Sequence, residues 1–410
     1  MKRALCLLLL AAAACGPADP PHSTPGDPLG KGTSDHPVIP PDPPPPVFQP
    51  GFHQALRHEM KAGAATTFRF NVPVGRSGDR VRIAFRAGSG SLTLRRVTVA
   101  RAGSAGALDS APVPVTFEGR RDAAGAAWAR ILSDAIAFPV SKNDELAVTF
   151  EVLGSMAASS IANFPGSYAR SGSYGDEPGP LGGTAHPRLV GLQTIEVEGP
   201  RERAIVAIGD SITEGYVSGP ITGGTTVESG FLRATDDYRN AWTRVAEQTL
   251  EAPIANAAIS GQGTWDAADH LDGDVFALPN LTDCVVLIGT NDLGGGSAEA
   301  IEGELSTLFQ ALQPHCQVWA STLLPKERTS AGSYEQVKAR RVAINDWLRS
   351  GTSPVPIDHV IDLESVTRSP SSVHQFATGF GEDGIHPSVR GHQAMAAEVA
   401  RVFEMAPPLQ

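Results

Sequence analysis

The 410-residue sequence predicts an α/β, doubly wound parallel sheet over residues 200–410, preceded by an all-β, sandwich-like domain over residues 51–199. Two observations support this prediction. Short runs in which polar and apolar residues alternate fill the first range, a pattern typical of antiparallel strands. In the second range, apolar runs alternate with helical periodicities, which favours parallel βαβ units with right-handed crossovers.

The N-terminus predicts export. Lys2 and Arg3 precede an apolar run over residues 4–14, which is too short to span a bilayer. Cys15 follows, and the string resembles a bacterial lipoprotein signal. The resemblance implies cleavage before Cys15 and lipidation of its thiol, so that residues 1–15 direct the protein to a membrane of the cell envelope. The alternative is an ordinary secretory peptide cut nearby, which gives a soluble secreted protein.

Residues 16–50 are dense in proline, and residues 43–46 are consecutive prolines. Such a segment cannot bury a core and is expected to form a semi-extended tether. It is either a spacer that holds the body of the protein away from a membrane or simply a disordered linker. Recognition by a polyproline-binding partner is a third interpretation.

Candidate strands of the β domain are short and separated by glycine. They lie at residues 67–72, 80–85, 92–99, 114–117, 129–132 and 146–150. This domain would bind carbohydrate, help to wall an active site, or have a purely structural role. The sequence offers no aromatic platform, since Trp128 and Tyr174 are scattered and single rings are normally core residues.

The C-terminal half predicts five buried strands and several amphipathic helices. The strands are expected at residues 204–208, 254–263, 285–292, 317–323 and 360–363, and the second of them runs into a glycine-bearing turn. Helices are expected at residues 298–312 and 334–349, and a last helix presents Met395, Val399, Val402 and Phe403 on one face. These apolar stripes are core packing and predict no cofactor site.

Two motifs supply a nucleophile with its base and acid. The first strand runs into Gly209-Asp210-Ser211-Ile212-Thr213-Glu214-Gly215, and far downstream the chain reads Asp383-Gly384-Ile385-His386-Pro387. A serine hydroxyl becomes a good nucleophile only when an imidazole takes its proton, and a carboxylate must hold that imidazole in one tautomer. Ser211, His386 and Asp383 can fill these three roles.

Two further strand ends offer donors for the oxyanion of acyl transfer. Gly261 follows the second strand, where a bare backbone can approach a ligand closely, and Asn291 ends the third strand with a side-chain amide. Together with the Ser211 N–H they form a plausible oxyanion hole. This chemistry requires no metal and no cofactor.

Several alternatives remain open at this point. If only one of these motifs were present, a non-catalytic explanation would be preferred: Ser211 would cap the next helix, or His386 would lie on the surface. His359, before a strand, and His392, within a helix, are rival bases without a carboxylate so placed. His374 is expected to be a solvated loop histidine. Ser260 and Asp292 are interpreted as residues that shape loops by hydrogen bonding.

The four blocks, at residues 209–215, 254–263, 285–292 and 383–387, resemble those of the SGNH (GDSL) hydrolase family in order and spacing. The resemblance covers about half of the chain and implies a flavodoxin-like α/β/α domain. It also implies Ser211 as nucleophile, His386 as base and Asp383 as orienting acid, with Ser211, Gly261 and Asn291 as the oxyanion hole. Ala258 stands where related carbohydrate esterases often have glycine, a departure that concerns the shape of that loop rather than the chemistry, because Gly261 is retained. The preceding half resembles the β-sandwich region of some extracellular SGNH esterases.

The four cysteines of the sequence allow at most one disulfide in the mature protein. Cys6 would leave with the signal, and Cys15 is the proposed lipid site. Cys284 and Cys316 lie near the starts of two strands that are neighbours in the sheet order of the family, so they could bridge in an oxidising compartment. Two buried free thiols are the alternative. The net charge of -11 argues against nucleic acid and against simple attraction to anionic lipid.

The sequence therefore predicts an exported serine ester hydrolase that works through an acyl-enzyme intermediate. Removal of O-acetyl or other short acyl groups from carbohydrate is favoured, because the segment 216–238, which follows the nucleophile, is polar and loops at this edge set specificity. The expected substrate is a small ester or an acetylated polysaccharide. A short-chain lipolytic esterase or lysophospholipase is the alternative, and a glycan-binding surface lipoprotein on a hydrolase scaffold is an alternative of another class.

Overall fold

The computed structural model describes residues 44–217 and 236–406. The predicted signal sequence, its Cys15, most of the proline-rich segment and most of the polar segment after Tyr216 lie outside these residues. The chain from Pro44 onward forms one compact unit. Within the described ranges, no helix is both long and apolar enough to cross a membrane.

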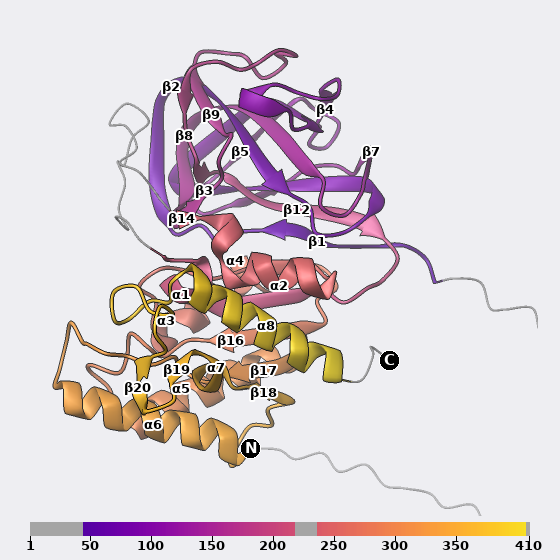
Figure 1. Ribbon diagram of the computed structural model, residues 1–410. Coiled ribbons are helices and arrows are strands. Elements are labelled where there is room, and N and C mark those ends of the chain that lie inside the picture. Colours follow the sequence, from indigo (N-terminus) through magenta and orange to yellow (C-terminus); the bar gives the residue numbers. More distant parts are fainter. Residues whose placement is uncertain (1–43, 218–235, 407–410) are drawn as a thin grey trace, which may run out of the picture. The chain divides into compact units, whose positions relative to one another are not determined.

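The N-terminal half is an antiparallel β-rich domain (Figure 1). Three long strands dominate it, namely β2 (His58–Pro73), β3 (Gly78–Arg101) and β8 (Glu145–Asn163). The shorter strands are β1 (Val47–His53), β4 (Val113–Pro114), β5 (Asp122–Gly125), β6 (Arg130–Leu132), β7 (Ile136–Val140), β9 (Tyr168–Ser171), β10 (Thr184–Ala185), β11 (Arg188–Val190) and β12 (Leu192–Gly199).

Two boundaries in this domain differ from the prediction. Strand β1 begins at Val47, directly after the proline run, so residues 47–50 belong to a strand that pairs with β12. The two runs predicted at 80–85 and 92–99 form one continuous strand, β3, whose first half pairs with β12 and whose second half pairs with β8. A register shift between Ala87 and Leu92 accommodates the glycine-containing stretch between the two runs.

The C-terminal half is built on a parallel five-stranded sheet in the order β15-β13-β16-β17-β18. The strands are β13 (Ile205–Gly209), β15 (Ile254–Asn256), β16 (Asp283–Leu287), β17 (Gln317–Ser321) and β18 (His359–Ile361). All residues of β13 and β16 are buried, as expected for central strands covered on both faces. The predicted doubly wound α/β fold is confirmed.

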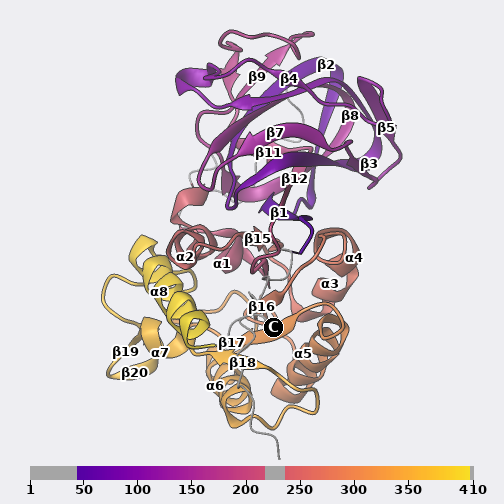
Figure 2. The same cartoon turned by 90° about the vertical axis from the view of Figure 1, so that its right-hand side faces the viewer.

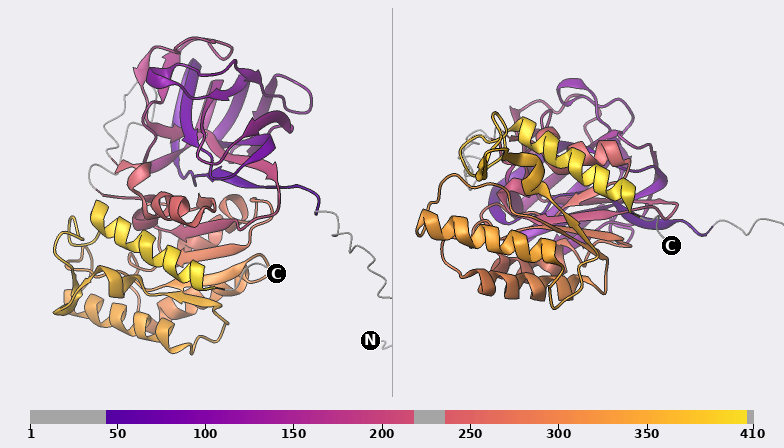
Figure 3. Two further views of the ribbon diagram at one scale, coloured as in Figure 1. Left: turned by 45° about the vertical axis from the view of Figure 1, so that its right-hand side comes forward. Right: turned by 60° about the horizontal axis from the view of Figure 1, so that its bottom comes forward.

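Helices cover both faces of this sheet (Figures 2 and 3). Helices α2 (Trp242–Leu250) and α8 (Val389–Met405) lie on one face, and α5 (Ala298–Leu312) and α6 (Tyr334–Ser350) lie on the other. The shorter helices are α1 (Ser211–Glu214), α3 (Thr264–Ala267), α4 (Leu271–Asp274) and α7 (Leu363–Thr367). Two short antiparallel strands, β19 (Arg368–Ser369) and β20 (Ser372–Phe376), and the two-residue strand β14 (Asp236–Asp237) complete the described strands. Three 3-10 helices also occur, namely η1 (Ser104–Gly106), η2 (Tyr238–Asn240) and η3 (Ala268–His270).

Local sequence explains the ends of the long helices. The Ser297 hydroxyl accepts a hydrogen bond from the Ala300 N–H at the start of α5, and Ser388 does the same for Gly391 at the start of α8. Helix α6 ends at Gly351, whose φ of 67° is readily adopted by glycine. The apolar stripe of α5, including Ile301 and Leu305, is buried against the sheet.

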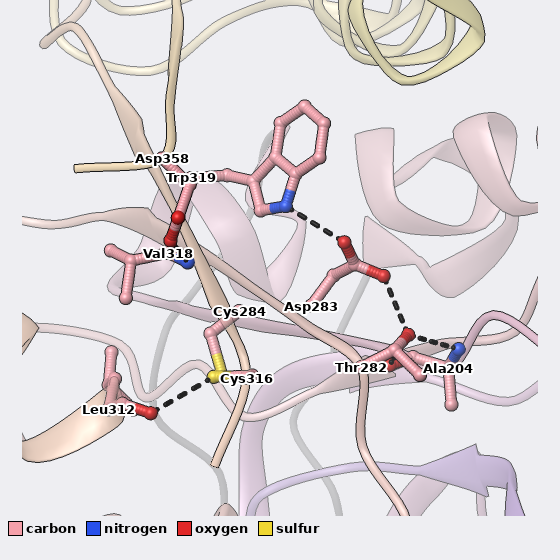
Figure 4. Close-up of a disulfide and its surroundings, with 9 residues drawn as sticks. All are labelled: Ala204, Thr282, Asp283, Cys284, Leu312, Cys316, Val318, Trp319 and Asp358. Carbon is pink, nitrogen blue, oxygen red and sulfur yellow. Dashed lines mark hydrogen bonds between the residues drawn. A yellow bond between two sulfur atoms is a disulfide. The ribbon is translucent and has the colours of Figure 1, made fainter. Parts of the chain in front are cut away.

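Cys284 and Cys316 form a disulfide with Cα atoms 5.8 Å apart (Figure 4). It links β16 to the residue before β17, and these two strands are paired neighbours. Beside it the Trp319 indole N–H donates to an Asp283 carboxylate oxygen at 2.9 Å, which fixes the same pair of strands a second time. The alternative of two free thiols does not hold in this structure.

Candidate active site

Strand β13 delivers Ser211 to the carboxyl edge of the parallel sheet, where active sites of open α/β folds lie. Gly209 is required there, because a Cβ atom on it would lie 2.4 Å from the Thr213 Oγ1 atom and 2.6 Å from the Leu287 carbonyl oxygen. The Asp210 carboxylate, rather than Ser211, caps helix α1 by accepting from the Ile212 N–H at 2.9 Å. The Ser211 hydroxyl is therefore available for another partner.

That partner is His386. The Ser211 Oγ atom lies 2.8 Å from His386 Nε2, and His386 Nδ1 lies 3.0 Å from Asp383 Oδ2. An ionised carboxylate only accepts hydrogen bonds, so Nδ1 carries the proton and Nε2 is the acceptor that faces the serine hydroxyl. This tautomer is the one that a general base needs.

The loop that carries Asp383 and His386 is held by hydrogen bonds from its own backbone N–H groups. The second carboxylate oxygen of Asp383, Oδ1, accepts from the backbone N–H of Ile385 at 3.0 Å and of His386 at 2.8 Å. Burial alone would raise the pKa of Asp383, but the hydrogen bonds from the His386 backbone and ring outweigh it and lower the pKa to about 2. Asp383 is therefore ionised at every pH at which the protein would work.

Burial is also the main influence on His386. It lowers the pKa of the ring below its ordinary value, and the hydrogen bond and charge of Asp383 oppose this only in part. The nearby charges of Lys326 and Arg328 lower the pKa further. The imidazole is consequently neutral at neutral pH and can accept the proton of Ser211.

Three N–H groups lie after neighbouring strands at the same edge. The Ser211 N–H begins helix α1 and so has no helical acceptor. Gly261 adopts a φ of 81°, and no heavy atom beyond its two chain neighbours lies within 4 Å of where its Cβ would be. The Asn291 amide donates one of its two hydrogens to the Gln262 carbonyl at 2.9 Å, which leaves the other available. Strands β15, β13 and β16, which these residues follow, are adjacent in the sheet.

The other histidines of the C-terminal half have different surroundings. His359 stacks on Trp319 with ring centroids 3.9 Å apart. His374 lies in β20, not in a loop as predicted, with Nδ1 3.5 Å from an Arg341 nitrogen. Strand pairing between β19 and β20 gave no clear signal in the sequence. Neither residue contacts Ser211.

His392 has a supporting position that sequence reasoning missed. Burial lowers its pKa to about 4, so the ring is neutral. Its Nδ1 accepts from the Trp242 N–H at 3.2 Å, and its Nε2 therefore donates to the Tyr216 carbonyl at 3.0 Å. Tyr216 in turn packs its ring against His386 with centroids 4.0 Å apart. The sequence signal that could have identified this support of His386 is the position of Tyr216, directly after the Gly209-to-Gly215 motif.

A second supporting segment, Lys326-Glu327-Arg328, carries no recognisable motif. The Lys326 amine donates to the Thr290 carbonyl at 2.7 Å, next to Asn291. The Glu327 N–H donates to the Gly384 carbonyl at 2.7 Å, and Arg328 hydrogen-bonds Asp383. The segment thus joins the loop of Asn291 to the loop of Asp383 and His386.

The remaining predicted residues shape loops. Asp292 Oδ2 accepts from the Thr264 N–H at 2.8 Å, and the Ser260 N–H donates to Glu214 at 2.9 Å. Within residues 44–217 and 236–406, no cluster of three or more histidine, cysteine, aspartate or glutamate side chains could hold a metal ion. The assembled groups can perform nucleophilic acyl transfer.

Residues 207–394 match the GDSL-like lipase/acylhydrolase family. Solved structures with a similar fold include a lipase/acylhydrolase from Enterococcus faecalis (20% identity, 51% of this chain and 99% of that chain, TM-score 0.37). A member of the lipolytic G-D-S-L family from Veillonella parvula matches at 17% identity over 50% of this chain and 100% of that chain, with a TM-score of 0.39. An active site mutant of a family two carbohydrate esterase from Clostridium thermocellum matches at 13% identity over 88% and 98%, with a TM-score of 0.39. No curated protein sequence matches the chain.

Proposed function

Residues 207–394 belong to the GDSL-like lipase/acylhydrolase family, and from this premise we propose that the protein is an exported serine esterase that removes short acyl groups, chiefly O-acetyl, from carbohydrate. The observation that supports the mechanism most strongly is the hydrogen-bonded chain from Ser211 through His386 to Asp383. Its order and tautomer are those of a nucleophile, a general base and an orienting acid.

In this proposal Ser211 Oγ attacks the ester carbonyl carbon while its proton passes to His386 Nε2. The imidazolium that forms is stabilised by Asp383, which stays ionised. When the bond to the alcohol oxygen breaks, His386 gives its proton to that oxygen, and an acyl group remains on Ser211. Water then attacks the acyl carbon, its proton goes to His386, and the acid leaves as Ser211 recovers its proton.

The oxyanion of each tetrahedral intermediate is placed among the Ser211 N–H, the Gly261 N–H and the second Asn291 amide hydrogen. Donors that are already oriented stabilise this charge without reorganisation, which is the largest single contribution in many acyl transferases. The hydrogen bond from Asn291 to Gln262 and the bond from Lys326 to Thr290 hold the Asn291 loop for that purpose.

A sugar as the alcohol of the ester is favoured by an exposed aromatic ring close in sequence to the loop of Gly261. Trp265, which is 47% exposed, follows the Gly261-to-Gly263 turn and offers a flat apolar face to a sugar ring.

Export is favoured by the disulfide between Cys284 and Cys316, because such bonds persist in oxidising compartments. We propose that Cys15 carries the lipid anchor, in keeping with the apolar run before it. A Cys15→Ser variant should no longer partition into the detergent phase on phase separation. Unchanged partitioning would argue against the anchor and leave ordinary secretion.

The function is tested with the chain from residue 44, which keeps strand β1 intact, and with its Ser211→Ala variant. Both are assayed on acetylated xylan and on nitrophenyl esters of rising chain length. Acetate release from the polymer, a sharp fall in rate beyond acetyl, and a loss of several orders of magnitude in Ser211→Ala are expected. A preference for long acyl chains would instead indicate a lipolytic esterase, and no Ser211-dependent turnover would sink the proposal.

A further inference from the structure

Glu214 is a buried carboxylate three residues after Ser211, at the end of helix α1. Its exposed fraction is 2%. Burial raises the pKa of this carboxyl, and backbone N–H groups that hydrogen-bond it act in the opposite direction. An isolated buried carboxylate is strongly unfavourable, so the arrangement of donors around it requires an explanation.

Three of these donors come from the N-terminal β-rich domain. Glu214 Oε1 accepts from the backbone N–H groups of Ser160 at 2.8 Å and Ile161 at 2.9 Å, and more weakly from that of Ala162 at 3.4 Å. Successive N–H groups that point at one oxygen form a concave anion site. The end of strand β8 is therefore shaped to bind the carboxylate of the catalytic half.

A positive charge of the same domain lies near this carboxylate. Arg188, in strand β11, is buried, and the charge of Glu214 partly offsets the effect of burial that lowers the pKa of Arg188 to about 10. Its Nε donates to the Ser159 carbonyl at 2.5 Å, so the guanidinium is fixed beside the concave site. The β-rich domain thus contributes both the hydrogen bonds and the charge that hold Glu214.

The other carboxylate oxygen acts on the active site. Glu214 Oε2 accepts from the Ser260 N–H at 2.9 Å, and Ser260 precedes Gly261. The Gly261 N–H is one of the proposed oxyanion donors and has no hydrogen-bond partner among the described residues. A single carboxylate consequently joins strand β8 to the loop that aims this donor.

The two halves also meet along the edge of the parallel sheet. Gln54, just after β1, forms a parallel bridge with Asn256 at the end of β15, and the Ala55 N–H donates to the Asn256 carbonyl at 2.8 Å. The Asn256 side chain in turn donates to the Thr213 carbonyl at 2.9 Å, within helix α1. The segment that leads to Gly261 is therefore braced from both sides.

We propose that Glu214 is a positioning residue through which the β-rich domain sets the oxyanion loop, so that this domain is part of the ester-hydrolysing machinery. The proposal rests on the assignment of Gly261 as an oxyanion donor and is independent of which ester is the natural substrate. Small displacements of a donor are enough to matter, since a misplacement of about 1 Å costs about 10²-fold in rate.

Glu214→Gln tests the proposal in the full chain. The amide keeps its size and an oxygen for the β8 donors, but it presents an NH₂ group to the Ser260 N–H. The matched control is Asp274→Asn, which replaces another buried carboxylate that contacts the β-rich domain, through Gln193 at 2.8 Å, and has no bond to the oxyanion loop.

Steady-state kinetics and the rate of active-site labelling are measured for both variants. With nitrophenyl acetate, Glu214→Gln should lower kcat by about 10- to 100-fold with KM changed by less than about threefold. The rate at which a fluorophosphonate labels Ser211 should fall similarly, because its phosphoryl oxygen occupies the oxyanion position. Asp274→Asn should change neither by more than about twofold. Equal behaviour of the two variants would overturn the proposal.

If Glu214→Gln does not fold, hydrogen exchange of the unaltered protein gives the answer. The amides of Ser160, Ile161 and Ser260 should be protected together, since one carboxylate binds all three, and rapid exchange of Ser260 would overturn the proposal. Lack of acetate release from acetylated xylan would count only against carbohydrate as the substrate. The role of Glu214 would still be tested, because fluorophosphonate labelling and nitrophenyl acetate hydrolysis do not require a carbohydrate.

Discussion

Arg328 donates a hydrogen bond to the same Asp383 oxygen that holds His386. Arg328 Nη2 lies 3.1 Å from Asp383 Oδ2, and His386 Nδ1 lies 3.0 Å from that atom. Arg328 also donates from Nε to the Asp383 carbonyl at 2.5 Å. The side chain of Arg328 is 60% exposed, so solvent screens its charge, but its contacts fix the acid of the proposed triad from outside.

Arg328→Gln should move the acidic limb of the kcat/KM profile to higher pH. His386 must be neutral to act as the base, so the rate falls as the pH drops through its pKa. The charge of Arg328 is one of the influences that lower this pKa, and its removal therefore raises it. For the unaltered protein, the midpoint should lie below about 6.5, the ordinary value for histidine.

The profile is measured with nitrophenyl acetate, beside an Arg401→Gln control. Arg401 lies near the end of α8 and pairs with Glu398, away from Asp383. The control should leave the midpoint where it is. A midpoint in Arg328→Gln that equals the control or lies below it would contradict the role given to Arg328.

Asn291→Ala should reduce kcat by about 10²–10³-fold, the usual loss for one oxyanion donor. The substitution also removes the bond from Asn291 to the Gln262 carbonyl, so loop movement contributes to the loss. Single-turnover kinetics should show that formation of the acyl-enzyme slows while KM changes little. A rate within threefold of the unaltered enzyme would exclude Asn291 from the oxyanion hole.

Loss of the Cys284–Cys316 disulfide should lower the free energy of unfolding by about 2–4 kcal/mol, because the bond closes a loop across a sequence separation of 32 residues. Urea unfolding of a Cys284→Ala, Cys316→Ala double variant measures this loss. Ser211-dependent activity in the absence of urea should be retained, since the pair lies at the starts of β16 and β17 and the active site lies at their carboxyl ends. Equal unfolding midpoints with and without the bond would contradict the prediction.

The α/β fold was predictable because its signals are local. The apolar runs of β13 and β16 and the period of α5 are legible in the sequence, and α5 begins and ends where the period predicts. The meeting of Ser211 with His386 and Asp383 was predictable from the two motifs and from the resemblance to the family. Sheet geometry places only Ser211, because the loop of Asp383 and His386 follows β20 and precedes α8.

The supporting contacts were not predictable, because they join segments that are distant in sequence and carry no motif. Glu214 contacts Ser160, which lies 54 residues earlier, and Arg328 contacts Asp383, which lies 55 residues later. Nothing local distinguishes Arg328 from a solvated arginine. The continuous strand β3 was missed for a related reason, since its glycine-containing stretch resembles a turn until pairing with β8 extends through it.

Trp265 should contribute to binding of polymeric substrate and not to the chemical step. It lies on α3, whose first N–H, that of Thr264, is bonded to Asp292 at 2.8 Å, and a Cβ on Gly296 would lie 3.1 Å from the indole. The ring thus rests between the loop of Gly261 and the loop that follows Asn291. In Trp265→Ala, loss of about 1 kcal/mol of stacking should raise KM for acetylated xylan by about fivefold.

The matched control for this prediction is Trp128→Ala, since Trp128 is 40% exposed but belongs to the β-rich domain. On nitrophenyl acetate, which has no sugar to stack, neither variant should change kcat by more than about twofold. On the polymer, only Trp265→Ala should raise KM if glycan contact is confined to the rim of the active site. An equal rise in both variants would place a second glycan contact on the β-rich domain, and no rise in Trp265→Ala would remove the indole from the proposed substrate site.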